Sequence, residues 1–262
     1  MSQYQEKATV TRVEQFSDVL YRLTFDSPLI TANAKPGQFV MVRTGLGKDP
    51  LLRRPFSIHQ ANKDGRLQLY FKVVGRGTDI LSRVKEGETV SIFGPLGNGF
   101  RIDPLTPSVI VGGGLGIAPL LFLVKENCRA KKVIADDIIL LGARQKVELE
   151  PLLHDFKQFG ISILTATDDG SHGHHGFITE VFDSLTFRSG TKVYCCGPEP
   201  MMDGVRALCK PRGLACQVSV ESVMACGMGA CLGCSKPAIN GNYTHVCVNG
   251  PVYDAEELVW NT

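Results

Sequence analysis

The stretch Val111-Gly112-Gly113-Gly114-Leu115-Gly116-Ile117-Ala118-Pro119 joins an apolar run at Ser108–Val111 to a second apolar run at Ile117–Arg129. A strand, a glycine turn and a helix in this order suit the diphosphate of a dinucleotide, because glycines let a phosphate approach the backbone where a helix begins. The pattern is not the ordinary Gly-x-Gly-x-x-Gly fingerprint, since Ile117 stands where the last glycine would be. We therefore predict a nucleotide site of a different type at this turn.

The region around this turn alternates between strand-like and helix-like segments, which predicts a parallel α/β sheet over residues 102–215. The predicted strands are Ser108–Val111, Asp137–Gly142, Ser162–Thr167 and Lys192–Cys196, the predicted helices are Ile117–Arg129, Glu148–Phe156, Ile178–Ser184 and Pro200–Lys210, and a last strand is Ala215–Val220.

The first hundred residues have a different rhythm, with short β-rich runs separated by turn residues. The six runs are Ala8–Val13, Val19–Phe25, Gln38–Arg43, Pro55–His59, Leu67–Val74 and Thr89–Phe93. Turns such as Lys35-Pro36-Gly37 and Lys63-Asp64-Gly65 separate them. Six short strands with this spacing predict a small antiparallel barrel over residues 1–101.

Two motifs on this barrel suit a flavin nucleotide. In Arg53-Arg54-Pro55-Phe56-Ser57, an arginine can pair with a diphosphate and the serine can hydrogen-bond the edge of a flavin ring. Gly77 and Thr78 precede a predicted helix at Asp79–Val84, whose first N–H groups suit a phosphate. Taken singly, each motif has an ordinary alternative. Arg53 and Arg54 are also typical of a solvated loop, and Gly77-Thr78 is also typical of a capped helix without a ligand.

The C-terminal tail contains the most specific pattern of the chain. Cys226, Cys231 and Cys234 are followed, after twelve residues, by Cys247, which is the C-x4-C-x2-C…C spacing of plant-type [2Fe–2S] sites. A structural zinc site of four cysteines usually consists of two short C-x2-C pairs, so this spacing favours iron over zinc. The predicted cluster module covers residues 216–262.

The other five cysteines, at 128, 195, 196, 209 and 216, have no metal-ligand spacing, and we assign most of them to core packing. Cys196 is the exception, because it precedes Gly197-Pro198.

Composition limits the function further. The 262 residues include 28 basic and 26 acidic side chains, a net charge of +2, which argues against a nucleic-acid partner. The start of the chain lacks the apolar stretch of a signal peptide, and the most apolar region, Ser108–Val124, is interrupted by glycines. We expect a cytoplasmic protein that does not span a membrane.

Three motifs in order are similar to the nicotinamide domain of the ferredoxin reductase family: Gly113–Pro119, Gly142-Ala143-Arg144, and Cys196-Gly197-Pro198-Glu199-Pro200-Met201. The barrel motifs resemble the flavin domain of the same family. The resemblance implies NAD at Gly113, Gly114, Gly116, Cys196, Gly197 and Pro198, with Cys196 a catalytic candidate near the nicotinamide. It implies FAD at Arg53, Arg54, Pro55, Phe56, Ser57, Tyr70, Phe71, Lys72, Gly77 and Thr78.

The order of a flavin-type barrel, a nicotinamide domain and a short cysteine tail resembles the electron-transfer subunits of type 1B dihydroorotate dehydrogenases. Leu52–Ile58, Gly94–Phe100 and Thr167–Ser171 fit that family closely. The resemblance implies FAD, a [2Fe–2S] cluster and NAD. It also implies a catalytic partner subunit that carries FMN and oxidises dihydroorotate to orotate in pyrimidine biosynthesis, in a heterotetramer of two plus two.

Three alternatives remain open at this point. The first is a reductase subunit of another complex, such as a sulfide dehydrogenase, and the second is a free-standing NAD(P)H–ferredoxin reductase in which Arg144 meets a 2′-phosphate. A non-enzymatic iron–sulfur redox sensor is the third, although such a sensor has no need of the nicotinamide motifs.

Overall fold

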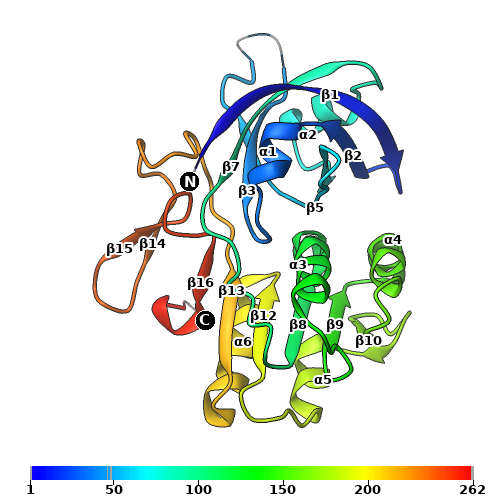
Figure 1. Ribbon diagram of the computed structural model, residues 1–262, viewed down its shortest axis with the longest axis vertical. Coiled ribbons are helices and arrows are strands. Elements are labelled where there is room, and N and C mark those ends of the chain that lie inside the picture. The colour runs from blue at the N-terminus through cyan, green and yellow to red at the C-terminus, as the bar shows by residue number, and fades with distance from the viewer. Residues whose placement is uncertain (1, 46, 48, 261–262) are drawn as a thin grey trace. The chain divides into compact units, whose positions relative to one another are not determined.

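The computed structural model describes residues 2–45, 47 and 49–260, and it divides into two compact units (Figure 1). The first unit comprises the chain up to Gly99 together with Glu221–Ser235 and Thr244–Pro251. The second comprises Phe100–Val220, Lys236–Tyr243 and the chain from Val252 onward. The tail predicted as a separate module at 216–262 therefore contributes segments to both units.

The first unit is built on a curled antiparallel sheet with strand order β4-β3-β7-β1-β2-β6-β5. Its strands are β1 (Tyr4–Gln15), β2 (Leu20–Asp26), β3 (Phe39–Arg43), β4 (Arg54–Ser57), β5 (Gln60–Ala61), β6 (Arg66–Lys72) and β7 (Thr89–Leu96), with two short helices, α1 (Pro28–Asn33) and α2 (Arg76–Ser82). The predicted barrel class is confirmed, and the six predicted strands are present. The seventh, β5, has two residues, which is too short for an alternating pattern to reveal.

The second unit is built on a sheet with strand order β11-β10-β9-β8-β12-β13-β16. Its strands are β8 (Ser108–Gly113), β9 (Ile138–Ala143), β10 (Ser162–Thr167), β11 (His174–His175), β12 (Lys192–Cys196), β13 (Ala215–Ser219) and β16 (Val252–Asp254). Neighbours from β11 to β13 pair in parallel, whereas β16 pairs antiparallel with β13 at the edge. The predicted parallel α/β fold is confirmed, and β8 is buried throughout, as a central parallel strand requires.

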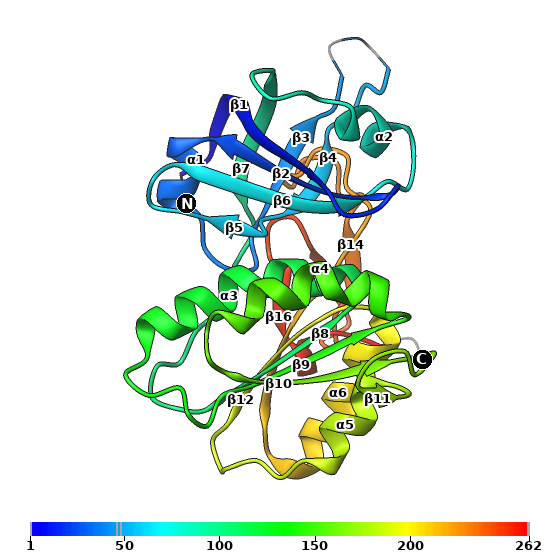
Figure 2. The same ribbon diagram turned by 90° about the vertical axis from the view of Figure 1, so that its right-hand side faces the viewer.

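Helices cover both faces of this second sheet. They are α3 (Ile117–Ala130), α4 (Lys146–Lys157), α5 (Ile178–Ser184) and α6 (Glu199–Cys209). Figure 2 shows α3 and α4 on one face, and α5 and α6 on the other. In the tail, β14 (Ser235–Pro237) and β15 (Tyr243–His245) form a separate two-stranded sheet. None of the helices in the described part of the chain combines the length and apolar character needed to cross a membrane.

The parallel topology brings functional motifs to one edge of the second sheet. Because the carboxyl ends of parallel strands point the same way, the loops that follow β8, β9, β10 and β12 lie along a common edge. These loops contain the glycine turn, Ala143-Arg144, Asp168-Asp169 and Gly197-Pro198 respectively. In the sheet, β8 lies between β9 and β12. The glycine turn therefore has the loops after β9 and β10 on one side and the loop after β12 on the other.

A buried polar network fixes the opposite end of this sheet. The side chains of Lys131 and Asp137 are 1% and 2% exposed and form an ion pair of 2.7 Å. Asp137 also accepts hydrogen bonds from the Ser108 backbone N–H (2.8 Å) and from Asn127 Nδ2 (2.9 Å). Lys131 Nζ in turn donates to Ser108 Oγ (2.7 Å). The network therefore anchors the first residue of β8, the strand that leads to the glycine turn.

We expect Asp137→Asn to lower the free energy of unfolding by about 3–5 kcal/mol, because it leaves the Lys131 ammonium buried without its counter-charge. Urea denaturation of the whole chain measures this. The neighbouring Asp136→Asn is the control, since Asp136 is half exposed and pairs with the exposed Arg188, and it should cost less than about 1 kcal/mol. Equal losses in the two variants would contradict the assigned role of the network.

Candidate functional site

The four tail cysteines lie in the first unit, against the barrel. Gly227 has a φ of +72°, and a Cβ at this position would lie 2.6 Å from Met41 Cγ of β3. Gly229 has a φ of +83°, and its Cβ would lie 2.7 Å from Val248 Cγ2. Both glycines are therefore required by backbone conformation and by close packing at once.

A second contact holds the other part of the tail on the barrel. The Asn98 N–H donates to Gly250 O (2.6 Å), and Asn98 Nδ2 donates to Asn249 O (2.8 Å) and Val248 O (3.2 Å). A Cβ on Gly97 would lie 2.5 Å from Gly250 O. The segment after β7 therefore fixes the backbone that immediately follows Cys247.

Within the described residues, no three His, Cys, Asp or Glu side chains are placed as ligands of one metal ion. The cysteines instead form two pairs. Cys234 Sγ and Cys247 Sγ are 3.2 Å apart, and Cys231 donates to the Cys226 sulfur through both its backbone and its thiol. Two pairs of thiolates fit two irons, each completed by bridging sulfides, better than they fit one zinc ion.

Backbone N–H groups also point at the sulfurs. Met228 N donates to Cys226 Sγ (3.4 Å), and Gly229 N donates to Cys247 Sγ (3.2 Å). Burial opposes ionisation of Cys226, but N–H groups of Met228, Cys231 and Ala230 lower its pKa to about 6. Burial and the neighbouring Cys234 thiol raise the pKa of Cys247 to about 12. The Cys247 thiol therefore needs nearby cationic charge, as metal ions supply, before it ionises.

Apolar side chains surround this loop at the surface. The large exposed ones in the cysteine-bearing segments are Val223, Met228, Leu232 and Val248. We call these four residues the apolar rim. Cys231, next to Leu232 in the chain, is itself exposed, so a second protein that covers these apolar side chains can approach its sulfur.

The predicted flavin residues lie on β4, β6 and α2 of the same unit. Phe56 and Phe71 are buried with ring centroids 5.5 Å apart, and Phe71 stacks on Tyr21 at 5.9 Å. Pro55, Ser57 and Lys72 are half-buried beside them. The aromatic pair therefore packs β4 against β6 in the interior of this unit.

The structure distinguishes the two adjacent arginines. Arg53 donates to Ser91 O (2.8 Å), Ser91 Oγ (3.0 Å) and Met41 O (3.4 Å), and burial, followed by the charge of Arg43, lowers its pKa. Arg54 instead extends toward α2, where a Cβ on Gly77 would lie 3.1 Å from Arg54 Nε. Arg53 thus supports the barrel, while Arg54 lies at the predicted phosphate position.

Gly77 fits a close approach by a ligand. Its conformation is one that other residues adopt, so backbone freedom does not explain the glycine, whereas the crowding around its missing Cβ does. Helix α2 begins at Arg76, three residues earlier than the predicted Asp79. The Thr78 hydroxyl explains this, because it accepts hydrogen bonds from Val74 N and Gly75 N and donates to Gly75 O.

The predicted nicotinamide residues meet at the carboxyl edge of the second sheet. A Cβ on Gly116 would lie 2.6 Å from the backbone of Cys196, and one on Gly197 would lie 3.0 Å from Gly113 N. Gly114 has a φ of +55° with nothing within 4 Å of its Cβ position, so its outer side is open. Such a glycine-lined edge fits a dinucleotide backbone.

The neighbouring loops add a group that the sequence motifs did not single out. Asp169 N donates to Arg144 O (3.2 Å), which joins the loop after β10 to the loop after β9. The Asp169 carboxylate accepts hydrogen bonds from Ser171 Oγ (2.6 Å) and Ser171 N (3.0 Å), and these bonds lower its pKa. A fixed, ionised carboxylate therefore lies at this part of the edge, close to Arg144.

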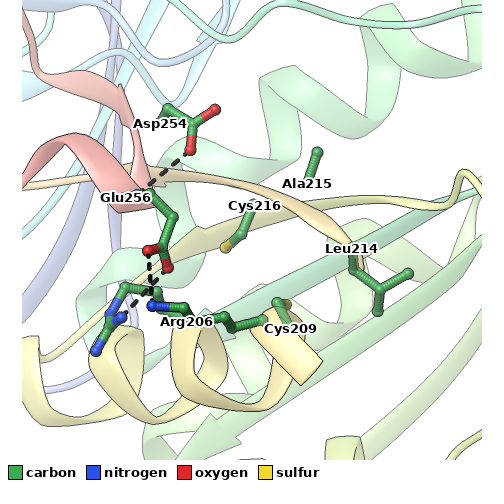
Figure 3. A pocket seen from close by; sticks show the side chains of 8 residues that line it. Arg206, Cys209, Leu214, Ala215, Cys216, Asp254 and Glu256 are labelled. Atoms are coloured by element: carbon green, nitrogen blue, oxygen red, sulfur yellow. Dashed lines mark hydrogen bonds and ion pairs between the residues drawn. The ribbon is translucent and has the colours of Figure 1, made fainter. Parts of the chain in front are cut away.

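Two cavities lie elsewhere in the second unit. One, of about 240 Å³, is bounded by α6, β13 and the turn after β16 (Figure 3). Its charges compensate each other, since Glu256 accepts from Arg206 (3.2 Å) and lies 3.6 Å from Lys210 Nζ. Cys209 and Cys216 form its buried wall, and the Cys209 thiol together with burial raises the pKa of Cys216. These thiols are core residues, as predicted.

The other cavity, of about 480 Å³, is bounded by β10, β11 and α5. His174 Nε2 and Glu180 Oε2 are 2.7 Å apart at its rim, and the hydrogen bond lowers the pKa of Glu180. This pair fastens β11 to the beginning of α5, which is a structural task.

Comparison with known families divides the chain in the same order as its motifs. Residues 7–100 match the oxidoreductase FAD-binding domain, and residues 110–207 match the oxidoreductase NAD-binding domain. Residues 221–259 match the iron–sulfur cluster binding domain of dihydroorotate dehydrogenase B. The chain is thus an oxidoreductase of the class that uses FAD, NAD and an iron–sulfur cluster.

Curated relatives narrow this class. The chain is 40% identical to the dihydroorotate dehydrogenase B (NAD(+)) electron transfer subunit of Desulforamulus reducens, over 97% of each chain. It is 36% identical to the same subunit of Fusobacterium nucleatum, over 97% of this chain and 98% of that one. The chain therefore belongs to the family of electron transfer subunits of dihydroorotate dehydrogenase B (NAD(+)).

Solved structures agree with the fold. A structure titled as that of an NADH-dependent reduced ferredoxin-NADP oxidoreductase is similar with a TM-score of 0.84 and 30% identity, over 97% of this chain and 90% of that one. A ferredoxin NADP+ reductase from Neisseria gonorrhoeae, with bound FAD and NADP, is similar with a TM-score of 0.67 at 16% identity. It covers 82% of this chain and 99% of that one, and it shares the fold alone.

We expect Arg54→Met to weaken FAD binding at least about tenfold, because it removes a charged hydrogen-bond donor from the phosphate position. Arg53→Met should instead lower the free energy of unfolding by about 1–3 kcal/mol, because Ser91 loses its partners, and should leave FAD affinity near that of the natural chain. Release of fluorescent flavin on dilution and urea denaturation measure the two effects. The assigned roles would be wrong if Arg53→Met weakened FAD binding and Arg54→Met only lowered the free energy of unfolding.

Proposed function

We propose that this chain carries electrons from a catalytic partner subunit, which oxidises dihydroorotate to orotate, to NAD+. The observation that supports it best is a pair of cysteine pairs inside an apolar surface rim, on a barrel of the FAD-binding type. When bound, FAD exchanges two electrons with nicotinamide and single electrons with an iron–sulfur cluster, so it joins the two kinds of chemistry.

For the cluster, we assign a [2Fe–2S] centre in which Cys226 and Cys231 bind one iron and Cys234 and Cys247 bind the other. The sulfur contacts within each pair support this division. The N–H groups of Met228 and Gly229 would stabilise the negative charge of the centre and tune its potential.

For FAD, Arg54 and Gly77 would hold the diphosphate, and the start of β4 would hold the flavin ring. Phe56 offers the ring an apolar face, and Ser57 offers a hydroxyl at its edge. Tyr70, Phe71, Lys72 and Thr78 would complete the surroundings, while Arg53 would support the barrel through Ser91 without holding FAD itself.

For NAD, the glycine turn at Gly113, Gly114 and Gly116 would receive the diphosphate. Cys196, held against Gly116 and followed by Gly197-Pro198, would position the nicotinamide and exclude water from it. Asp169 would lie toward the adenosine half and disfavour a 2′-phosphate by charge repulsion, which supports NAD over NADP.

The partner would dock on the apolar rim, because burying these side chains brings a second redox centre close to Cys231. The family resemblance implies that this partner is a catalytic subunit containing FMN, and that two copies of each subunit assemble. The complex would work in the cytoplasm, in pyrimidine biosynthesis.

Purification of the tagged chain from its native cell tests the proposal. We expect a flavoprotein to co-purify and the complex to reduce NAD+ with dihydroorotate, while the chain alone does not. Oxidation of dihydroorotate by the isolated chain, or a native complex inert toward dihydroorotate, would overturn the proposed division of labour.

A second candidate function is reduction of a ferredoxin-type carrier with NADPH, which the similarity to the ferredoxin-NADP oxidoreductase structure supports. Comparing the rates with NADH and NADPH distinguishes it, because that function requires NADPH to be used well. A third possibility is a redox sensor without catalysis. It would be favoured if flavin-loaded protein failed to reduce an artificial acceptor with NADH.

We expect serine at position 226, 231, 234 or 247 to abolish transfer from the partner and to leave NADH oxidation with an artificial acceptor partly intact. The reason is that serine oxygen replaces thiolate sulfur poorly as an iron ligand, while the flavin and nicotinamide residues are unchanged. Visible absorption bleached by dithionite reports the cluster. Cys128→Ser is the control, and loss of the cluster in that variant as well would contradict the ligand assignment.

A further inference from the structure

One buried hydroxyl of the barrel has no partner. Thr44 directly follows β3 and is 5% exposed, and its Oγ1 atom makes no hydrogen bond within the described residues. Other buried threonines of this unit are satisfied: Thr24 Oγ1 accepts from Gln68 Nε2 (3.2 Å), and Thr31 Oγ1 donates to Ser27 O (3.0 Å). A buried hydroxyl without a partner is costly, so such a group in a native structure calls for a ligand.

The position of this hydroxyl indicates the ligand. A Cβ on Gly77 would lie 3.3 Å from Thr44 Oγ1 and 3.1 Å from Arg54 Nε. The hydroxyl, the guanidinium and the glycine backbone thus converge on one place that any larger residue at position 77 would occupy. A donor without a partner, beside a cation and an uncovered backbone, suits an oxygen anion.

The neighbouring threonine does not serve this purpose. The Thr78 hydroxyl donates to Gly75 O (2.9 Å) and accepts from Val74 N (2.9 Å) and Gly75 N (3.2 Å), so its hydrogen is already used within its own turn. Thr44 has its hydrogen available. Of these two hydroxyls, the one distant in sequence is therefore the better donor for a ligand.

We propose that Thr44 binds the diphosphate of FAD, donating its hydroxyl hydrogen to a phosphate oxygen beside Arg54. This inference rests on the proposed place of the diphosphate between Arg54 and Gly77. Arg54 supplies charge from a flexible side chain, whereas Thr44 supplies a donor fixed by a short β-branched side chain at the end of a strand. Thr44 would thereby set where along the strand end the diphosphate lies.

The test uses the whole chain with FAD and the cluster bound. We expect Thr44→Val, which keeps the shape and removes the hydroxyl, to release FAD about tenfold more readily, as loss of a hydrogen bond to a charged group requires. One of the two phosphorus resonances of bound FAD should shift in the ³¹P NMR spectrum. Thr44→Ser should retain the affinity and both resonances of the natural chain.

Thr24→Val is the matched control, because it removes a satisfied hydroxyl of similar burial from the same sheet and should change neither FAD release nor the phosphorus spectrum. Cluster absorption reports correct folding of each variant, and Thr44→Ala replaces the valine variant if that one fails to fold.

The proposal about Thr44 is overturned if the hydroxyl-free variants bind FAD as the natural chain does with an unshifted phosphorus spectrum. It is also overturned if Thr44→Ser loses as much affinity as Thr44→Val, because the methyl group would then be the part that matters. These failures differ from failure of the underlying site, in which Arg54→Met would leave FAD affinity unchanged as well.

Discussion

The contact between the loop after β7 and the tail around Gly250 holds the backbone beside Cys247 against the barrel, and the arrangement of the cysteine site depends on it. Gly97 leaves room for the Gly250 carbonyl, and Asn98 donates three hydrogen bonds to backbone carbonyls of residues 248–250. Cys247 directly precedes this backbone segment, and twelve residues separate it from Cys234, the last cysteine of the tight loop. The barrel thereby holds both cysteine pairs, so the cysteines lie in the same compact unit as the predicted flavin residues.

The cysteine site shows how backbone N–H groups and burial act against each other. N–H groups favour the Cys226 thiolate, while burial and a neighbouring thiol favour the protonated form of Cys247. Metal ions change this balance by supplying positive charge where the protein supplies dipoles alone. The glycines of the loop matter because Gly227 and Gly229 adopt positive φ values and pack closely against Met41 and Val248, where a side chain would not fit.

Much of this arrangement is readable in the sequence, because the motifs are local. The cysteine spacing, the glycine turn and the alternation of elements predicted the fold class and the cofactors that the family comparisons support. The sequence did not distinguish neighbouring residues that have different contacts, such as Arg53 and Arg54. Arg53 precedes β4 and donates hydrogen bonds to Ser91, whereas Arg54 begins β4 and lies beside Gly77, and these contacts depend on strand pairing that the sequence does not reveal. Thr44 gave no signal, because a threonine at a strand end is ordinary until its surroundings are known.

The short strands were missed for a related reason. β5, β11, β14, β15 and β16 have two or three residues each, and their pairing partners, not their own patterns, define them. The tail was predicted as one module, since its cysteines dominate its sequence, and residues 221–259 match a single cluster-binding domain, while contacts assign alternate pieces of the tail to two units.

The strand β16 gives the tail a protective role. It covers the outer edge of β13, which would otherwise present unpaired backbone groups along Gln217, Val218 and Ser219. Uncovered sheet edges invite pairing with other chains and lead to aggregation. A chain shortened to its flavin and nicotinamide regions would thus expose the edge of β13 and be prone to aggregate through it.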